Sequence, residues 1–169
     1  MSADRPKIRA VFDCMMFLQA AARRNSPAGI CLRLVESGAI ELYLSEEILT
    51  EIRDVLTRPR LRQKFPALTD QLVGQFLAAV EKRKRAIAVL EVPRVFEYQR
   101  DPRDEPYISL AIAAKANYLV SRDNDILGLA DASTADGKRL QSEAPQLRVL
   151  DPVAFLLEMR RRVQVPRGD

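Results

Sequence analysis

The sequence contains no histidine, few cysteines and few glycines. Its 169 residues include two cysteines and six glycines, and no apolar run reaches the ~20 residues that cross a bilayer. The absence of histidine excludes Ser-His-Asp and Cys-His catalysis, a histidine general base and nearly every zinc site. Any catalysis must therefore use carboxylates, hydroxyls, lysine or a metal ion held by oxygen ligands.

The cysteines and the N-terminal segment indicate the compartment. Cys14 and Cys31 are the only two, and in a reducing compartment they are most simply buried thiols. The first ten residues, MSADRPKIRA, lack the apolar core of a signal peptide. We expect a cytoplasmic protein without a membrane anchor, and the length favours one domain.

Basic residues slightly outnumber acidic ones, 27 against 23, and the pI is near 9.3. This excess favours a polyanionic or an acidic protein partner. It is concentrated in three clusters: RPRLRQK (58–64), KRKR (82–85) and RRR (160–162). Each cluster alone is also typical of a solvated helix face, and the three together point modestly toward nucleic acid.

Apolar segments of strand and helix type alternate along the chain. We predict strands at 7–12, 39–44, 86–90, 118–121 and 147–150. Ser26, Ser45 and Thr69 each precede a predicted helix as N-caps, Pro59 ends the helix that Ser45 opens, and Asp151-Pro152 opens the last one. The polar segment 131–143 is interpreted as a loop with one helical turn. The alternation predicts an α/β fold with a parallel sheet covered on both faces.

Acidic residues gather where ligands bind in such folds, beyond the carboxyl ends of the strands. Asp13 directly follows the first strand, and Asp123 and Asp125 closely follow YLVS (118–121). Asp101 and Asp104 stand at the start of a helix that is apolar nearly all round, where the helix dipole favours negative charge. Helix capping alone also explains Asp104 and Asp123.

Glu51 lies at the border of the buried stripe of its helix. It can extend to solvent or reach over the sheet edge toward Asp13. Several carboxylates that converge without histidine or a compensating lysine repel one another. A divalent cation that prefers oxygen ligands, Mg²⁺ or Mn²⁺, resolves the repulsion. Such a site can activate water and stabilise charge that develops on a phosphate.

Four ordered segments carry a family resemblance: VFDCMMFLQA, the stretch from SPAGICLRLVESGAIELYLSEEILTEI to TRPRLR, DPRDEPYISLAIAAKANYLVSRDNDIL and LDPVAFL. From about Ile8 to Leu157 the sequence resembles the PIN-domain family of metal-dependent ribonucleases, in particular the VapC-like toxins of bacterial type II toxin–antitoxin systems. The resemblance implies a three-layer α/β/α sandwich with a central, mostly parallel sheet. It also implies a single domain over 1–169 with its core at about 8–157.

The resemblance implies a site as well. Four acids would hold Mg²⁺ or Mn²⁺ and act in RNA cleavage: Asp13, Glu51, Asp104 and Asp123. Three further residues would have auxiliary roles: Asp125, Glu105 and Ser121. Glu105 competes with Asp104, because a shift of one residue in the helix start exchanges them.

The resemblance further implies partners: RNA, a cognate antitoxin protein and a second copy in a homodimer. The predicted helix 69–85 carries an apolar stripe and a basic end, which can serve such contacts or pack on its own sheet.

One position departs from the family pattern, which has Asp-x-Asn after the first strand. Met15 stands where the asparagine is usual, so a hydrogen bond that orients the site is missing. An alternative function is therefore a catalytically weakened PIN scaffold that binds RNA or protein.

Met15 also argues against an aspartyl-phosphate phosphatase, which needs an aspartate there. A receiver domain needs an acidic pair near its first strand and a lysine after a late strand, and this sequence has neither at those positions.

Overall fold

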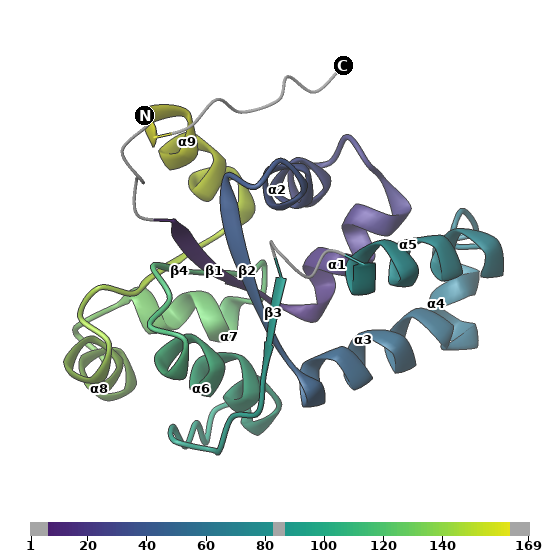
Figure 1. Ribbon diagram of the computed structural model, residues 1–169. Coiled ribbons are helices and arrows are strands. Elements are labelled where there is room, and N and C mark those ends of the chain that lie inside the picture. Colours follow the sequence, from purple (N-terminus) through teal and green to yellow (C-terminus); the bar gives the residue numbers. More distant parts are fainter. Residues whose placement is uncertain (1–6, 83–86, 163–169) are drawn as a thin grey trace.

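A five-stranded parallel sheet forms the centre of the fold in the computed structural model, which describes residues 7–82 and 87–162 (Figure 1). The strands are β1 (Ile8–Phe12), β2 (Ile40–Ser45), β3 (Ile87–Leu90), β4 (Tyr118–Val120) and β5 (Arg148–Leu150). Their order across the sheet is β3-β2-β1-β4-β5, and every described pair is parallel. The five predicted strands are confirmed, although Lys7, Ala39, Ser121 and Leu147 lie just outside the observed strands and Ala86 lies outside the described residues.

The order of the strands decides where a site can form. β1 pairs with β2 on one side and with β4 on the other, with Ala10 opposite both Leu42 and Tyr118. The chain thus builds the sheet outward from β1 in one direction, then returns to build it in the other. Such a reversal leaves a crevice beyond the carboxyl ends of the two strands that flank it. Here these are the ends of β1 and β4.

Helices cover both faces of the sheet, so the predicted three-layer α/β/α arrangement is confirmed. In Figure 1, α2 and α9 lie on one side of the sheet, α6 and α8 lie on the other, and α3, α4 and α5 form an arm beside it. The helical elements are α1 (Cys14–Ala22), α2 (Pro27–Glu36), α3 (Glu46–Thr57), α4 (Pro59–Lys64), α5 (Asp70–Lys82), η1 (Pro102–Asp104), α6 (Glu105–Ala113), α7 (Asn124–Leu127), η2 (Gly128–Ala130), α8 (Ala135–Glu143) and α9 (Pro152–Arg162).

The predicted helix starts are confirmed by their capping contacts. The hydroxyls of Ser26, Ser45 and Thr69 each accept a hydrogen bond from the backbone N–H three residues later, at 3.1–3.2 Å. α2 ends before Gly38, whose φ of 79° lies in the left-handed region that glycine adopts most easily. Pro59 separates α3 from the short helix α4, of which it is the first residue.

The prediction of a loop over 131–143 was wrong, because α8 occupies most of this segment. The Thr134 hydroxyl caps α8 by accepting from the Gly137 N–H at 3.0 Å. Gly137 also allows the close approach of the Asp131 carbonyl, which a Cβ atom would meet at 2.0 Å. Leu140 anchors the helix in the core. With so little apolar surface, the segment shows almost no hydrophobic periodicity, and only its cap marks it as a helix.

The apolar stripe of α5 packs mainly against α1 and α3 of the same chain. Val73 and Val80 are buried, and the ring of Phe76 lies edge-on to Phe17 of α1 at 6.4 Å between centroids.

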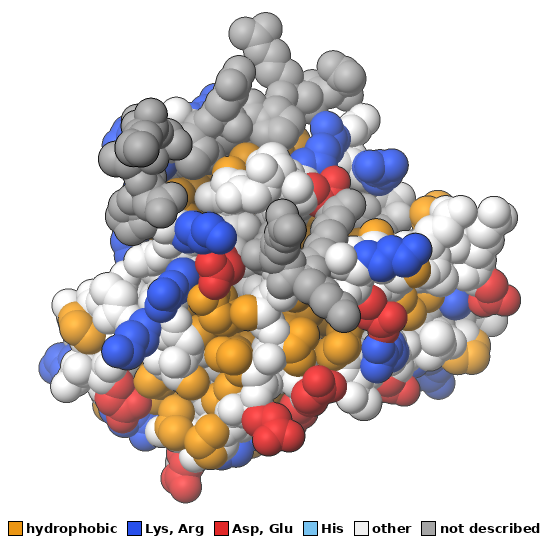
Figure 2. All heavy atoms as spheres, viewed as in Figure 1, with side chains coloured by type: hydrophobic (Ala, Val, Ile, Leu, Met, Phe, Trp, Pro, Cys, Tyr) orange, Lys and Arg blue, Asp and Glu red, His pale blue; other side chains and the backbone are white. Residues whose placement is uncertain are grey.

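Both cysteines are buried free thiols. Figure 2 shows hydrophobic side chains at the surface over β3 and α6; β3 is an edge strand, and its Val89 is 44% exposed. No helix in the described part of the chain is long and apolar enough to span a membrane.

Candidate metal centre

Asp13 sits at the end of the central strand and is almost completely buried, with 4% of its surface exposed. It caps α1, since its Oδ1 accepts from the Met16 N–H at 3.1 Å. Its own N–H donates to the carbonyl of Val120, at the end of β4, at 3.2 Å. The strand register therefore fixes Asp13 directly beside the end of β4.

Ser121 joins the ends of β1 and β4 through its hydroxyl. The buried hydroxyl donates to Oδ2 of Asp13 and accepts from the N–H of Asp123 at 2.9 Å. Asp123 in turn caps α7, because its Oδ1 accepts from the Asp125 N–H at 2.8 Å. One hydroxyl thus holds the carboxylate of Asp13 in place and orients the loop that carries Asp123.

Four aspartates form a compact group beside this pair of strand ends. Each of them offers a carboxylate oxygen, and these oxygens all lie within 4.8 Å of one another: Asp101, Asp104, Asp123 and Asp125. The short 3-10 helix η1 brings the first two together, and the turn after β4 supplies the other two. Oxygen-only donor sets of this kind suit hard divalent cations.

Two arginines neutralise only the outer members of the group. The Arg103 Nε contacts Asp101 at 3.1 Å, and the Arg100 Nε contacts Asp125 at 2.6 Å. Asp104 is different, because it is 7% exposed and its Oδ2 is a buried oxygen with no hydrogen-bond partner within the described ranges. A buried carboxylate oxygen without a donor needs either a proton or a cation. The group therefore fits a divalent metal ion.

Burial and mutual repulsion raise the pKa of the two innermost acids. Burial is the main cause that raises the pKa of Asp104 to about 7, and the charges of Asp123, Asp101, Asp125 and Asp13 add to it. Burial also raises the pKa of Asp13 to about 6, against the opposing effect of the hydrogen bond from Ser121. The chain alone therefore does not stabilise both acids in their charged forms at neutral pH.

Glu51 lies apart from the group of four aspartates. Its Oε2 accepts a hydrogen bond from the Tyr107 hydroxyl at 2.7 Å, which ties α3 to α6. Burial is the main cause that raises the pKa of the Cys14 thiol, and the charges of Glu51 and Asp13 add to it, so both acids lie near this residue. Glu51 thus stands on the Asp13 side of the site rather than beside Asp104.

Glu105 is engaged elsewhere, although it adjoins Asp104 in sequence. Its two oxygens accept from the Tyr98 N–H at 2.9 Å and from Arg94 at 3.1 Å. Among the residues considered from sequence, the structure brings together Asp104, Asp123 and Asp125, with Asp13 linked through Ser121. Asp101 joins the group but was predicted only as an acidic residue at the helix start. In the structure its side chain caps η1, because Oδ1 accepts from the Arg103 N–H at 3.1 Å.

One of three comparisons with known proteins gives a family. The profile described as "PIN domain" matches residues 9–125. An uncharacterized protein of Methanocaldococcus jannaschii, MJ1680, is 27% identical over 159 residues, which cover 94% of this chain and 96% of that protein. The crystal structure of PAE2754 from Pyrobaculum aerophilum superposes with a TM-score of 0.49 at 14% identity, over 91% of this chain and 90% of the other.

We predict that the metal-free protein loses stability as the pH rises from about 4 to about 7. In this window the folded Asp104, with its pKa near 7, keeps a proton that the unfolded chain releases. The expected loss of unfolding free energy is roughly 2 kcal/mol, about 5 °C in Tm for a domain of this size. Thermal unfolding in the presence of a chelator measures it.

Asp104→Asn should make this pH dependence clearly smaller, with the remainder due to Asp13, whose pKa is also raised, to about 6; Asp54→Asn, on the exposed face of α3, should leave it unchanged. Mn²⁺ should raise the Tm of the wild type more at pH 7.5 than at pH 5. An identical pH slope in Asp104→Asn and wild type would contradict the assignment.

Proposed function

The chain belongs to the PIN domain family, and we propose that it is an endoribonuclease that depends on Mg²⁺ or Mn²⁺ and hydrolyses phosphodiester bonds in RNA. PIN domains are generally nucleases. One observation carries the proposal: the buried carboxylate oxygen of Asp104 that lacks a hydrogen-bond partner within the described ranges, set among three further aspartates. An apolar or hydrogen-bonded residue at this position would suffice for a purely structural role.

Asp13, Glu51, Asp104 and Asp123 are the residues we propose as metal ligands, with Asp125 at the margin of the site. A divalent cation held there supplies Lewis-acid polarisation of a phosphate and lowers the pKa of a bound water. Ser121 and the Met16 N–H fix the rotamer of Asp13. Tyr107 does the same for Glu51. Such fixed orientation of ligands is what a hard cation with strict geometry requires.

Two of the predicted basic clusters are less suited to hold the substrate than their sequence indicates. In the 58–64 cluster, Arg58 pairs with Asp54 and Arg62 pairs with Asp70. In the 160–162 cluster, Arg162 donates to the hydroxyl of Tyr118, the first residue of β4, and so lies at the edge of the sheet opposite the acids. Of the 82–85 cluster, only Lys82 lies within the described residues.

We further propose that this nuclease is the toxin of a toxin–antitoxin pair and acts as a homodimer. A nuclease with a solvent-accessible site damages its own cell unless a partner covers that site, and the family resemblance supports both the antitoxin and the dimer.

The alternative function is a PIN scaffold that binds RNA or protein without cleavage. It is favoured by Met15, which is 42% exposed on the first turn of α1 where the family pattern has a polar residue. RNA binding without metal-dependent cleavage would establish it.

We expect Asp104→Asn to reduce RNA cleavage by about a hundredfold or more, because it removes one negative charge at constant volume from the centre of the proposed ligand set. Cleavage of a fluorogenic single-stranded RNA in Mn²⁺ measures it, and excess chelator should abolish the wild-type activity. Asp54→Asn is the matched control and should cut normally. Wild-type cleavage that persists in chelator would refute the metal mechanism.

Tyr107→Phe should weaken metal binding by roughly tenfold and lower activity to a similar degree, since Glu51 loses the donor that orients it. Raising the Mn²⁺ concentration should restore most of the activity. Tyr43→Phe removes a hydroxyl that donates to Glu41 on β2, remote from the acids, and serves as the control. Unchanged Mn²⁺ dependence in Tyr107→Phe would show that Glu51 acts outside the metal centre.

A further inference from the structure

A hollow of about 740 Å³ opens at the C-terminal end of α1. Its lining comes from three stretches of the chain: the end of α1 with the loop to α2 (Gln19, Arg23 and Asn25), the residue after α4 (Phe65) and the turn after β4 (Arg122). We call it the α1–α2 hollow. We propose that it is a subsite that binds the nucleotides of single-stranded RNA adjacent to the cleaved bond, an inference that rests on the proposed function.

The position of the α1–α2 hollow relative to the acids is set by two short paths along the backbone. Arg122 stands between Ser121, which bonds Asp13, and Asp123. α1 runs from its cap, Asp13, to the hollow, and a helix of nine residues spans about 13 Å. An RNA strand whose phosphate reaches the acids therefore has its neighbouring nucleotides within reach of the hollow.

The arginines of the hollow keep their charge available. Arg23 and Arg122 are exposed, and within residues 7–82 and 87–162 neither side chain has a carboxylate partner. Many other arginines do: Arg53, Arg58, Arg62, Arg94, Arg100, Arg103, Arg139 and Arg148. Since the acidic group repels a polyanion, RNA can approach it only with cationic contacts close by, and these two arginines supply them.

Phe65 and the polar residues suit a nucleotide rather than a bare anion. Phe65 is half-buried in the wall of the hollow, and the Lys64 ammonium lies 5.8 Å from the centre of its ring. Aromatic rings beside cations are the usual means of holding single-stranded bases. Gln19 adds a hydrogen-bonding amide to the lining, whereas the Oδ1 of Asn25 already accepts from Arg33.

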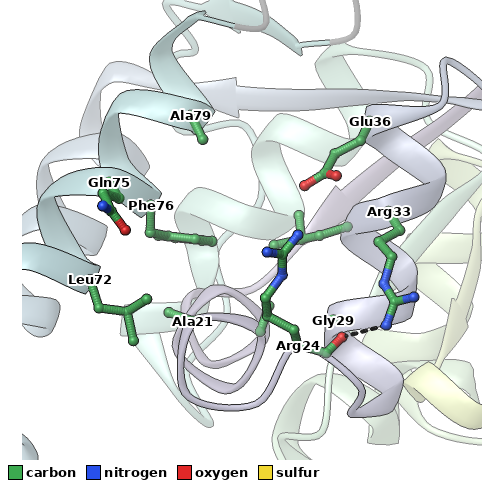
Figure 3. Close-up of a pocket in the computed structure, with 11 residues that line it drawn as sticks. Ala21, Arg24, Gly29, Arg33, Glu36, Leu72, Gln75, Phe76 and Ala79 are labelled. Atoms are coloured by element: carbon green, nitrogen blue, oxygen red, sulfur yellow. Dashed lines mark hydrogen bonds between the residues drawn. The ribbon is translucent and has the colours of Figure 1, made fainter. Parts of the chain in front are cut away.

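Arg24 lines this hollow but also a second one, between α2 and α5 (Figure 3). There its side chain extends into the middle of the pocket, opposite the ring of Phe76, while its carbonyl accepts from Arg33 at 3.1 Å. Arg24 is thus shared between two surfaces, and the test uses Arg23 and Arg122 instead.

The test measures binding of an RNA of about ten nucleotides by fluorescence anisotropy, with all variants in a cleavage-deficient Asp104→Asn background. Arg23→Ala combined with Arg122→Ala should weaken binding roughly tenfold near 0.1 M salt, and lower the slope of log K against log salt by about 1.4. Arg160→Ala combined with Arg161→Ala removes the same charge from exposed positions at the opposite edge of the sheet and should change binding less than twofold.

The role of Phe65 is tested by Phe65→Leu, which keeps an apolar contact with the core. It should weaken binding of the RNA while leaving binding of inorganic polyphosphate unchanged. Circular dichroism and Tm verify the fold of each variant, and Phe65→Tyr, which retains the ring, should restore RNA binding.

Equal weakening by the two double variants, or no weakening by either, would overturn the subsite. Stronger binding of a poly-glutamate peptide than of RNA would overturn it in favour of an acidic protein partner. Cleavage is measured separately with the wild-type protein, which keeps Asp104. If that protein cuts RNA but the α1–α2 hollow variants bind normally, the subsite fails and the proposed function stands. If it binds through the hollow but never cuts, the subsite stands and the proposed function fails.

Discussion

Repulsion among carboxylates that the backbone forces together is the constraint on which this structure depends. The register of β1 against β4 places Asp13 beside the turn that carries Asp123, and the start of α6 brings Asp104 to the same edge. Asp13 and Asp123 cannot move away without breaking a helix cap, and burial confines Asp104. Separate contacts stabilise the individual carboxylates instead. Ser121 donates a hydrogen bond to Asp13, and arginines form ion pairs with Asp101 and Asp125. Asp104 alone keeps a buried oxygen without a partner among the described residues.

The chain order of the elements could be predicted because strands, helices and caps each have a local signal. Ser45, for example, both ends a buried strand and caps the next helix. The acidic edge followed from that order alone, since parallel strands all end at one side of the sheet. α8 could not be predicted in the same way. Its only strong local signal is Thr134, and it packs through so few apolar side chains that no periodicity appears.

Side-chain directions at the site were beyond sequence reasoning for a different reason. Asp104 and Glu105 are neighbours at a helix start, and which of them faces the other acids depends on the 3-10 turn at Pro102–Asp104. That turn brings Asp104 to the group and sends Glu105 to Tyr98 and Arg94. Basic clusters were misleading in a comparable way, because Arg58 and Arg62 are paired. Arg23 and Arg122 are about a hundred residues apart, and neither belongs to the basic clusters identified in the sequence.

Met15 bears on the choice between an enzyme and a binding scaffold. Its side chain is 42% exposed, so the core gains little from it, and any effect of this residue is confined to hydrogen bonding at the site. Asp13, the acid it adjoins, already has two donors, Ser121 and the Met16 N–H. A carboxylate oriented by two donors keeps its rotamer without a third. A buried Asp104 whose Oδ2 has no hydrogen-bond partner among the described residues destabilises the fold. A scaffold that only binds a partner does not require such a residue. Retention of that unfavourable group alongside a well-oriented Asp13 supports the enzyme.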